Sequence, residues 1–244
     1  AMPRTMLNDQ QWSKLLAIFR HFNIYLKLNL RNFIEAILFR IRTGCPWRDL
    51  PQEFGKPNSI FKKYNRWSKN SKFMNIFKLF SHNADKEWIF IDGSHVRAHQ
   101  HSAGIKNQDI SKSIGGNSSK IHLAIDSDGN PIEFIISDGT SHDIKVAPDL
   151  VSKLDLTESE MLCADKGYDS ESFREKIRES NTKANIPRRS NAKSSNVHMD
   201  WYMYKIRHLV ENAFCRLKQF RGIATRYDKL KRNYQSAVAL ACIF

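Results

Sequence analysis

The sequence predicts an α/β protein in which a mixed five-stranded sheet flanked by helices follows a small all-α domain. Helical periodicity fills the first third of the chain, to about residue 83, without a strand pattern. From residue 88 onward, short apolar runs, turns and helical stretches alternate. We therefore expect a helical domain at residues 1–85 and a sheet domain at residues 86–244.

The N-terminal region has the pattern of successive short helices. Residues 8–22 and 29–43 are predicted to form two amphipathic helices, and Gly44 and Pro46 end the second. A third helix is predicted to begin near Asn58, and a fourth to span about 71–83.

The third of these helices is expected to have a basic outer face. Ile60, Tyr64 and Trp67 share its apolar face. The basic residues assigned to the other face are Lys62, Lys63, Arg66 and Lys69. Three short helices, the last with a basic face, are what a helix-turn-helix module presents to the major groove of DNA. A generic three-helix bundle with a solvated basic face is the alternative that this pattern leaves open.

The second region reads as strands and helices in the order strand, hairpin, helix, strand, helix, strand, helix. The predicted strands are residues 88–92, 121–125, 132–136, 161–165 and 184–186. The predicted helices between them are residues 144–154 and 170–180. Two of the strands end in an acid, Asp92 and Asp165. Because ligand sites in open sheets lie beyond the strand ends, these two acids can meet there.

The stretch from Tyr204 to Arg221 contains no Pro or Gly and is predicted to form one helix. At about 100° per residue, Tyr204, Arg207, Glu211 and Lys218 fall on one narrow face. The opposite face is apolar and would pack in a core. A single carboxylate among cations indicates a group that meets both a metal ion and a polyanion. A solvated face with i,i+4 ion pairs is the alternative.

The net charge of +14 is unevenly distributed. Residues 1–87 carry a net charge of +10, residues 88–172 carry −7, and residues 173–244 carry +11. Basic flanks fit a polyanion, most simply nucleic acid. An acidic centre repels that ligand unless it holds a divalent cation.

The remaining composition excludes several classes of protein. No apolar run approaches the roughly 20 residues of a membrane span, and we expect neither a leader nor a membrane partner. The four cysteines are far apart and form no C-x-x-C pair, which disfavours a zinc ribbon or a disulfide framework. Reduced thiols of this kind indicate the cytoplasm.

Asp92, Asp165 and Glu211 together suit a hard cation, Mg²⁺ or Mn²⁺, better than zinc. Two such ions stabilise both the attacking and the leaving oxygen in a displacement at phosphorus. Other acids are weaker candidates for this site. Asp126 and Asp128 lie in a predicted turn, Asp169 is expected to cap a helix, and His142-Asp143 could border the site. His95, His99 and His101 lack a second ligand pair for zinc.

Three segments resemble motifs of DDE-type insertion-sequence transposases. Ile91-Asp92-Gly-Ser-His-Val-Arg97-Ala-His99-Gln-His101 resembles their first-aspartate motif, and Ala164-Asp165-Lys166-Gly167-Tyr168-Asp169 resembles the second. Tyr204-x2-Arg207-x3-Glu211-x6-Lys218 matches their Tyr-Arg-Glu-Lys signature. The segment Arg42-Thr-Gly-Cys-Pro-Trp-Arg-Asp-Leu-Pro51 is similar to the leader domain of the subgroup typified by insertion sequence five.

The resemblance runs from about residue 6 to 244 and implies an RNase H-like catalytic fold. It implies that Asp92, Asp165 and Glu211 hold two Mg²⁺ ions, for which Mn²⁺ substitutes. It also implies binding of terminal inverted repeats, cleavage at the transposon ends and joining of the freed 3′-hydroxyls to target DNA. Gly93 and Gly167 stand where many relatives carry Ser or Thr, and Ala, respectively. Such relatives often run slightly beyond Phe244, so we expect a trimmed terminus.

The remaining roles follow from that chemistry. Arg207 and Lys218 are expected to hold the scissile phosphate, and Tyr204 to stack on an unpaired base or bind a phosphate. Arg188 and Arg189 are expected to contact the DNA backbone, although surface charge without a role is their alternative. Cutting two ends together requires two active sites, so we expect a homodimer on DNA, at the nucleoid of a bacterial cytoplasm.

Two other functions remain open at this point. The chain could be a domesticated relative that binds DNA without strand transfer, and the loss of a triad acid would favour this reading. It could instead be a simple RNase H-like nuclease, which would have little use for a separate basic helical domain.

Overall fold

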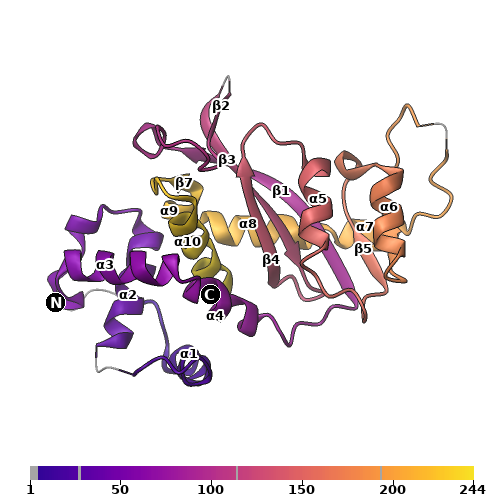
Figure 1. Cartoon of the computed structure of the whole chain (residues 1–244). Coiled ribbons are helices and arrows are strands. Elements are labelled where there is room, and N and C mark those ends of the chain that lie inside the picture. Colours follow the sequence, from indigo (N-terminus) through magenta and orange to yellow (C-terminus); the bar gives the residue numbers. More distant parts are fainter. Residues whose placement is uncertain (1–4, 27–28, 114, 193) are drawn as a thin grey trace. The chain divides into compact units, whose positions relative to one another are not determined.

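The computed structural model describes residues 5–26, 29–113, 115–192 and 194–244 (Figure 1). Its internal contacts divide the chain into two compact units. The first contains the helices up to Phe80, residues His99–Gln108 and the C-terminal segment Leu217–Phe244. The second contains Ser81–Ala98 and Asp109–Arg216.

The N-terminal helices form much as their sequence predicts. They are α1 (Asp9–His21), α2 (Leu30–Thr43), α3 (Pro57–Lys69) and α4 (Lys72–Phe80), with 3₁₀ turns η1 (Trp47–Asp49) and η2 (Gln52–Phe54). Asn8 and Gln11 form a capping box at the start of α1. Gly44, with a φ of 74°, ends α2 in the left-handed conformation that favours glycine. Pro57 occupies the first turn of α3, where its missing N–H costs nothing.

The C-terminal segment completes the core of this first unit. It forms α9 (Arg221–Ala224), the two-residue strand β7 (Thr225–Arg226) and α10 (Lys231–Ile243), and α10 contacts α2, α3 and α4. The buried hydroxyl of Tyr64 in α3 donates to the carbonyl of Asn233 in α10. The turn η3 (Gln100–Ser102) also belongs to this unit.

The compact units therefore differ from the predicted boundary at residue 85. The N-terminal helices bury their apolar faces against residues more than 130 positions later in the chain, and sequence periodicity carries no information about such a contact. The assignment of DNA binding to residues 1–85 and of catalysis to residues 86–244 is functional, and it stays a prediction.

The second unit is built on a mixed sheet. Its strands are β1 (Trp88–Ala98), β2 (Ser111–Ser113), β3 (Gly116–Ile125), β4 (Pro131–Asp138), β5 (Met161–Cys163) and β6 (Lys183–Asn185). The order β4–β3–β1–β5–β6 has antiparallel pairing from β4 to β1 and parallel pairing from β1 to β6, and β2 pairs with the start of β3 (Figure 1). The predicted mixed sheet and RNase H-like fold class are confirmed, but β2 adds a strand beyond the five that were predicted.

Alternation along the strands separates the two faces of this sheet. Ile89 and Ile91 of β1 and Leu162 of β5 point into a buried apolar cluster with residues of α5 (Asp143–Val151) and α6 (Glu171–Arg178). Residues at the alternate positions, which include Asp92, point to the opposite face. The turn η4 (Lys166–Tyr168) follows β5. The remaining helices are α7 (Trp201–Ile206) and α8 (His208–Lys218), of which α8 ends beyond this unit.

Several element predictions need correction. The single helix expected from Tyr204 is instead α7 and α8, because a turn at Arg207 with i→i+3 hydrogen bonds (Arg207 N to Tyr204 O, 3.3 Å; Val210 N to Arg207 O, 3.0 Å) interrupts the α-helical ladder. Strand β1 runs six residues beyond Asp92 because β3 pairs with it as far as Arg97. Helix periodicity did not detect either feature, since both depend on tertiary contacts.

Candidate active site

Asp92 and Asp165 occupy equivalent positions along the adjacent parallel strands β1 and β5, each two residues after the last residue pair that the two strands share. Phe90 of β1 pairs in register with Cys163 of β5. Asp92 lies two residues after Phe90, and Asp165 lies two residues after Cys163. Asp92 belongs to the face opposite α5 and α6, and Asp165 lies close enough for its charge to raise the pKa of Asp92. Local hydrogen bonds orient them, because Gly93 N donates to Asp92 Oδ1 (2.8 Å) and Gly167 N to Asp165 Oδ1 (2.7 Å).

Glu211 joins this group through Arg207. The Arg207 guanidinium donates from Nη1 to Asp92 Oδ2 (3.1 Å) and from Nη2 to Glu211 Oε1 (2.7 Å). The Arg207 side chain is 16% exposed, whereas the Glu211 side chain is 56% exposed. Arg207 therefore connects the largely buried Asp92 to the exposed Glu211. The same guanidinium lies 5.7 Å from the centre of the Tyr204 ring. Three of the four signature residues therefore meet at one place.

The environment of Asp92 favours a nearby cation. Burial raises the pKa of Asp92, the Gly93 N–H and the Arg207 charge lower it, and the Asp165 and Asp143 charges raise it further. A buried carboxyl beside two other acids is costly to ionise unless a positive charge compensates it. In this structure Arg207 supplies that charge.

The three carboxylates have the right chemistry for a metal ion, but their positions in this structure do not form a metal site. Asp92, Asp165 and Glu211 offer only carboxylate oxygens, which suit Mg²⁺ or Mn²⁺. In the described part of the chain, however, no three His, Cys, Asp or Glu side chains are grouped closely enough to hold an ion. The residues fit the ion chemically, and Arg207 holds two of the three carboxylates.

A second polar cluster lies on the other face of β1, and sequence reasoning recognised only part of it. Asp143 at the start of α5 accepts from Lys120 Nζ (2.7 Å) and lies 3.2 Å from Nδ1 of the buried His122. Lys120 and His122 lie two residues apart on β3, so their side chains share one face, and His122 pairs in register with Gly93. Of this cluster, only Asp143 was expected near the site. The sequence around Lys120 does not indicate that Lys120 is buried.

Gly93 is small because Asp143 lies directly above it. A Cβ at Gly93 would overlap Asp143 Oδ1 and would come within 2.8 Å of Lys120 Cε. A Ser or Thr side chain at position 93 would require this cluster to move. Gly93 thus brings α5 close to the strand that carries Asp92.

The predicted DNA-contacting residues are distributed over both units. Lys62, Arg66 and Lys69 are exposed on α3, as expected. Lys63 is not on that face, because its Nζ lies 4.1 Å from the Phe33 ring centre and the side chain is half-buried. At about 100° per residue, Lys63 falls beside Tyr64 and Trp67 rather than opposite them.

The loop arginines are held by partners near the second aspartate. Arg188 pairs with Glu171 (2.9 Å), and Arg189 Nη2 donates to the carbonyl of Gly167 (3.3 Å). Lys218 is exposed at the end of α8. A contact with DNA stays a prediction for each of these residues.

Two of the weaker acid candidates have structural roles. Asp126 is buried and accepts from the backbone N–H groups of Asp128 and Asn130, as expected for an acid in a turn. Asp169 was expected to cap α6, but it instead accepts from Arg174 Nη1 (2.7 Å) and from the backbone N–H of Arg189 (2.7 Å). Asp169 therefore connects α6 to the loop that follows β6.

No helix within the described ranges is both long and apolar enough to cross a bilayer. Cys45, Cys163, Cys215 and Cys242 are free thiols. Within the histidine run, His99 stacks on Tyr227, with the ring centres 4.8 Å apart and the planes at 26°.

Two family profiles match this sequence. "Transposase DDE domain" matches residues 83–244, and "Putative transposase of IS4/5 family" matches residues 7–77. The uncharacterized protein y4sN of Sinorhizobium fredii is 38% identical over 80 residues, which are 33% of this chain and 64% of that protein. The putative transposase for insertion sequence element IS6501 of Brucella ovis is 35% identical over 124 residues, which are 50% of this chain and 93% of that protein.

Solved structures give only weak likenesses. The piggyBac transposase synaptic complex with hairpin DNA matches with a TM-score of 0.39 and 12% identity, over 76% of this chain and 50% of that one. The pre-cleavage Mos1 transpososome matches with a TM-score of 0.32 and 7% identity, over 100% and 89% of the two chains. The fold assignment therefore rests on strand order and the family match. With the DDE profile covering Asp92, Asp165 and the segment that holds Arg207 and Glu211, the chain belongs to the DDE transposases, of the IS4/5 type.

Proposed function

We propose that the chain binds the terminal inverted repeats of an insertion sequence, cleaves the transposon ends and joins the freed 3′-hydroxyls to target DNA. Asp92, Asp165 and Glu211 are the metal-binding residues in this proposal, with Mg²⁺ as the ion and Mn²⁺ as a substitute. The observation that carries it is the link from Asp92 to Glu211 through one guanidinium, with Asp165 near enough for its charge to raise the pKa of Asp92.

Divalent ions held by these carboxylates would stabilise the attacking and leaving oxygens of an in-line displacement at phosphorus. Arg207 now neutralises Asp92 and Glu211, and the fixed fork of its guanidinium fits a phosphate equally well. In the active complex Arg207 exchanges its carboxylate partners for the phosphate beside the scissile bond. Lys218 supplies a second cation to the same strand, and Tyr204 a phenol or ring face.

DNA binding in this proposal relies on the basic parts of the chain. Lys62, Arg66 and Lys69 form an exposed basic face on α3, which would read or follow the duplex of a terminal repeat. Arg188 and Arg189 lie beside the second aspartate and would contact the backbone near the cut. The names of the solved complexes describe transposases with DNA, and the Brucella relative is named for an insertion sequence.

Assembly and location follow from the reaction. Two transposon ends cut together require two copies of this acid cluster, so the proposed active form is a homodimer on DNA. Its place in the cell is the bacterial cytoplasm, at the nucleoid, where its substrate is.

The test uses the full chain and labelled DNA that carries the sequences flanking its coding region. Cut positions are mapped with and without Mg²⁺, and binding is measured separately by mobility shift. Asp92→Asn, Asp165→Asn and Glu211→Gln should abolish cutting and retain binding. Asp128→Asn, at an exposed acid of the β3–β4 turn, should cut normally. A triad variant that cuts normally in Mg²⁺ would remove that residue from the active site.

The binding-only alternative is favoured by one feature, the absence of three assembled metal ligands among the described residues. It predicts end binding without any cut in Mg²⁺ or Mn²⁺, even with the wild-type chain. The same assay therefore separates the two functions.

A further inference from the structure

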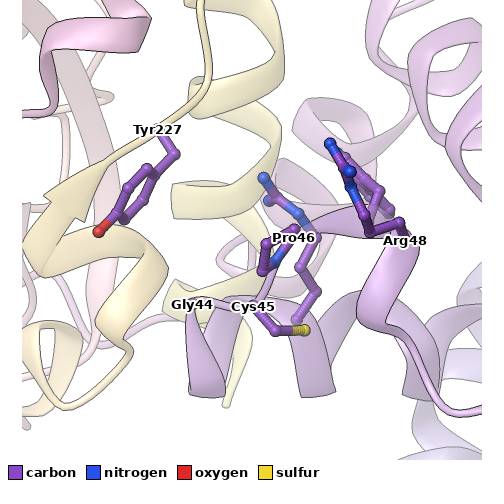
Figure 2. Close-up of a pocket in the computed structure, with 7 residues that line it drawn as sticks. Gly44, Cys45, Pro46, Arg48 and Tyr227 are labelled. Atoms are coloured by element: carbon purple, nitrogen blue, oxygen red, sulfur yellow. The ribbon is translucent and has the colours of Figure 1, made fainter.

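A cavity of about 530 Å³ lies within the first unit, away from the acid cluster in sequence and chemistry. Figure 2 shows Tyr227 on one side of it and the turn Gly44–Arg48, which follows α2, on the other. Arg40 and Trp47 complete the lining. Pockets of several hundred Å³ accommodate small organic ligands or a single nucleotide unit.

The cavity is lined by two guanidinium groups, those of Arg40 and Arg48, that retain capacity to donate hydrogen bonds. Arg40 is 8% exposed, lies over the Trp47 ring at 4.3 Å, and is 3.4 Å from Asp228 Oδ1. Its Nε is buried and has no hydrogen-bond partner in the described part of the chain. Arg48 is exposed at the lip of the cavity. Arg40 and Arg48 line the same cavity, so an anionic oxygen bound there could accept from either guanidinium.

An aromatic ring faces this cationic side. Tyr227 is 45% exposed, and its ring stacks on His99 at 4.8 Å and 26°. His99 is fixed in turn, because its backbone N–H donates to the carbonyl of Arg226 (2.9 Å). One face of the Tyr227 ring is thus supported, and the residue lines the cavity. A supported, solvent-accessible ring is a platform on which a base stacks.

We propose that this cavity binds one unpaired nucleotide of a DNA strand, with the base on Tyr227 and its phosphate on Arg40 and Arg48. The bases of duplex DNA are stacked on their neighbours, so the proposed ligand is an unpaired strand and not a duplex. The inference rests on the proposed function only in taking DNA as the ligand, because none of the triad acids lines the cavity. It gives a role to the neighbouring Trp47 and Arg48 of the Gly44–Arg48 turn.

The test measures binding of a fluorescent single-stranded oligodeoxynucleotide of about 10 nucleotides with one 2-aminopurine, at fixed salt. A blunt duplex is measured in parallel. The wild-type chain should quench the 2-aminopurine through stacking. Tyr227→Ala should weaken single-strand binding about tenfold and abolish quenching, since stacking contributes that order of affinity per base. Tyr227→Phe keeps the ring and should retain both signals.

Arg48→Ala should weaken single-strand binding and lower the slope of log affinity against log salt by about one. Duplex affinity should change less than about twofold in both the Tyr227→Ala and Arg48→Ala variants. Tyr25→Ala and Arg20→Ala are matched controls, because both residues are exposed in the same unit and do not line this cavity. Circular dichroism verifies that each variant is folded.

Two results would overturn the proposal. One is single-strand affinity and quenching that are unchanged in Tyr227→Ala and Arg48→Ala. The other is displacement of the oligonucleotide by a polyglutamate peptide as effectively as by unlabelled strand, which would identify a peptide site. Asp92→Asn should leave all of these signals intact, so failure of the catalytic proposal and failure of this one are distinguishable.

Discussion

Arg207 links the first aspartate to the glutamate 119 positions later in the chain, with Nη1 3.1 Å from Asp92 Oδ2 and Nη2 2.7 Å from Glu211 Oε1. A guanidinium can make two such bonds in fixed directions, whereas a lysine ammonium is a point charge. The pair of contacts therefore sets the position of Glu211 relative to the sheet. In the proposed function Arg207 therefore neutralises Asp92 and Glu211 before DNA binds and holds a DNA phosphate afterwards.

Replacing Arg207 should affect both stability and activity. We expect Arg207→Ala to lower the free energy of unfolding by about 1–3 kcal/mol, because Asp92 is left buried without its charged partner. Arg207→Lys should recover part of this stability but little cleavage, since it cannot hold both carboxylates or a phosphate in fork geometry. Urea denaturation and the end-cleavage assay measure the two effects.

Arg178→Ala is the matched control, because Arg178 pairs with Glu171 at 3.0 Å with both side chains about half exposed. Its loss should cost less than about 1 kcal/mol. Equal costs for the two variants would mean that the Arg207 bridge is an ordinary surface pair.

Gly93→Ala should destabilise the chain by about 1–3 kcal/mol through overpacking against Asp143 and Lys120. Cleavage should fall as well, because the strand displacement moves the adjacent Asp92. The reason can be tested in an Asp143→Ala background, where the obstructing carboxylate is gone. There, adding Gly93→Ala should cost less than about 0.5 kcal/mol, although Asp143→Ala is itself costly since it leaves Lys120 buried without its partner. If Gly93→Ala cost as much stability in the Asp143→Ala background as in wild type, the contact with Asp143 would not be the cause of the destabilisation.

Tyr168 and Tyr64 form a matched pair of buried phenols. Both are almost completely buried, but only the Tyr64 hydroxyl has a hydrogen-bond partner in the described part of the chain. Tyr64→Phe should therefore cost about 1 kcal/mol or more, because the carbonyl of Asn233 loses its donor. Tyr168→Phe should change stability by less than about 0.5 kcal/mol. A larger loss for Tyr168→Phe would show that its hydroxyl is bonded in solution.

Asp138 should make stability depend on pH in the acid range. Hydrogen bonds from Ser141 and Thr140 lower the pKa of Asp138 from 3.8 to about 2. Because the folded state favours the ionised form, its contribution is present above about pH 4 and is lost as pH falls toward 2. Asp138→Asn should therefore be less stable than wild type by about 1 kcal/mol at pH 6, and the gap should narrow at pH 3. A gap that widened on acidification would contradict this assignment.

Much of the site follows from local pattern, and the remainder depends on contacts between distant segments. Asp92 and Asp165 were predicted because an acid after a buried strand has a defined place in an open sheet. Glu211 and Arg207 were predicted to share a face, and they are bonded.

The sequence could not show that Arg207 also reaches Asp92, or that a turn at Arg207 divides the helix, since both features require the sheet to be in place. It could not place α10 among the N-terminal helices either, because amphipathic periodicity identifies a buried face but not its partner. Lys63 was misassigned because only its charge, and not its angle relative to Trp67, was considered.

The most direct measurement of the central claim is metal-specific rescue of end cleavage. Asp92→Cys, Asp165→Cys and Glu211→Cys replace an oxygen ligand with a thiolate, which Mg²⁺ binds poorly and Mn²⁺ accepts better. We predict that all three variants are inactive in Mg²⁺ and partly active in Mn²⁺, whereas Arg207→Ala is not rescued by Mn²⁺. Activity of the cysteine variants in Mg²⁺ at the wild-type level, or rescue at Asp143→Cys in place of these positions, would contradict the assignment of the three acids as metal ligands.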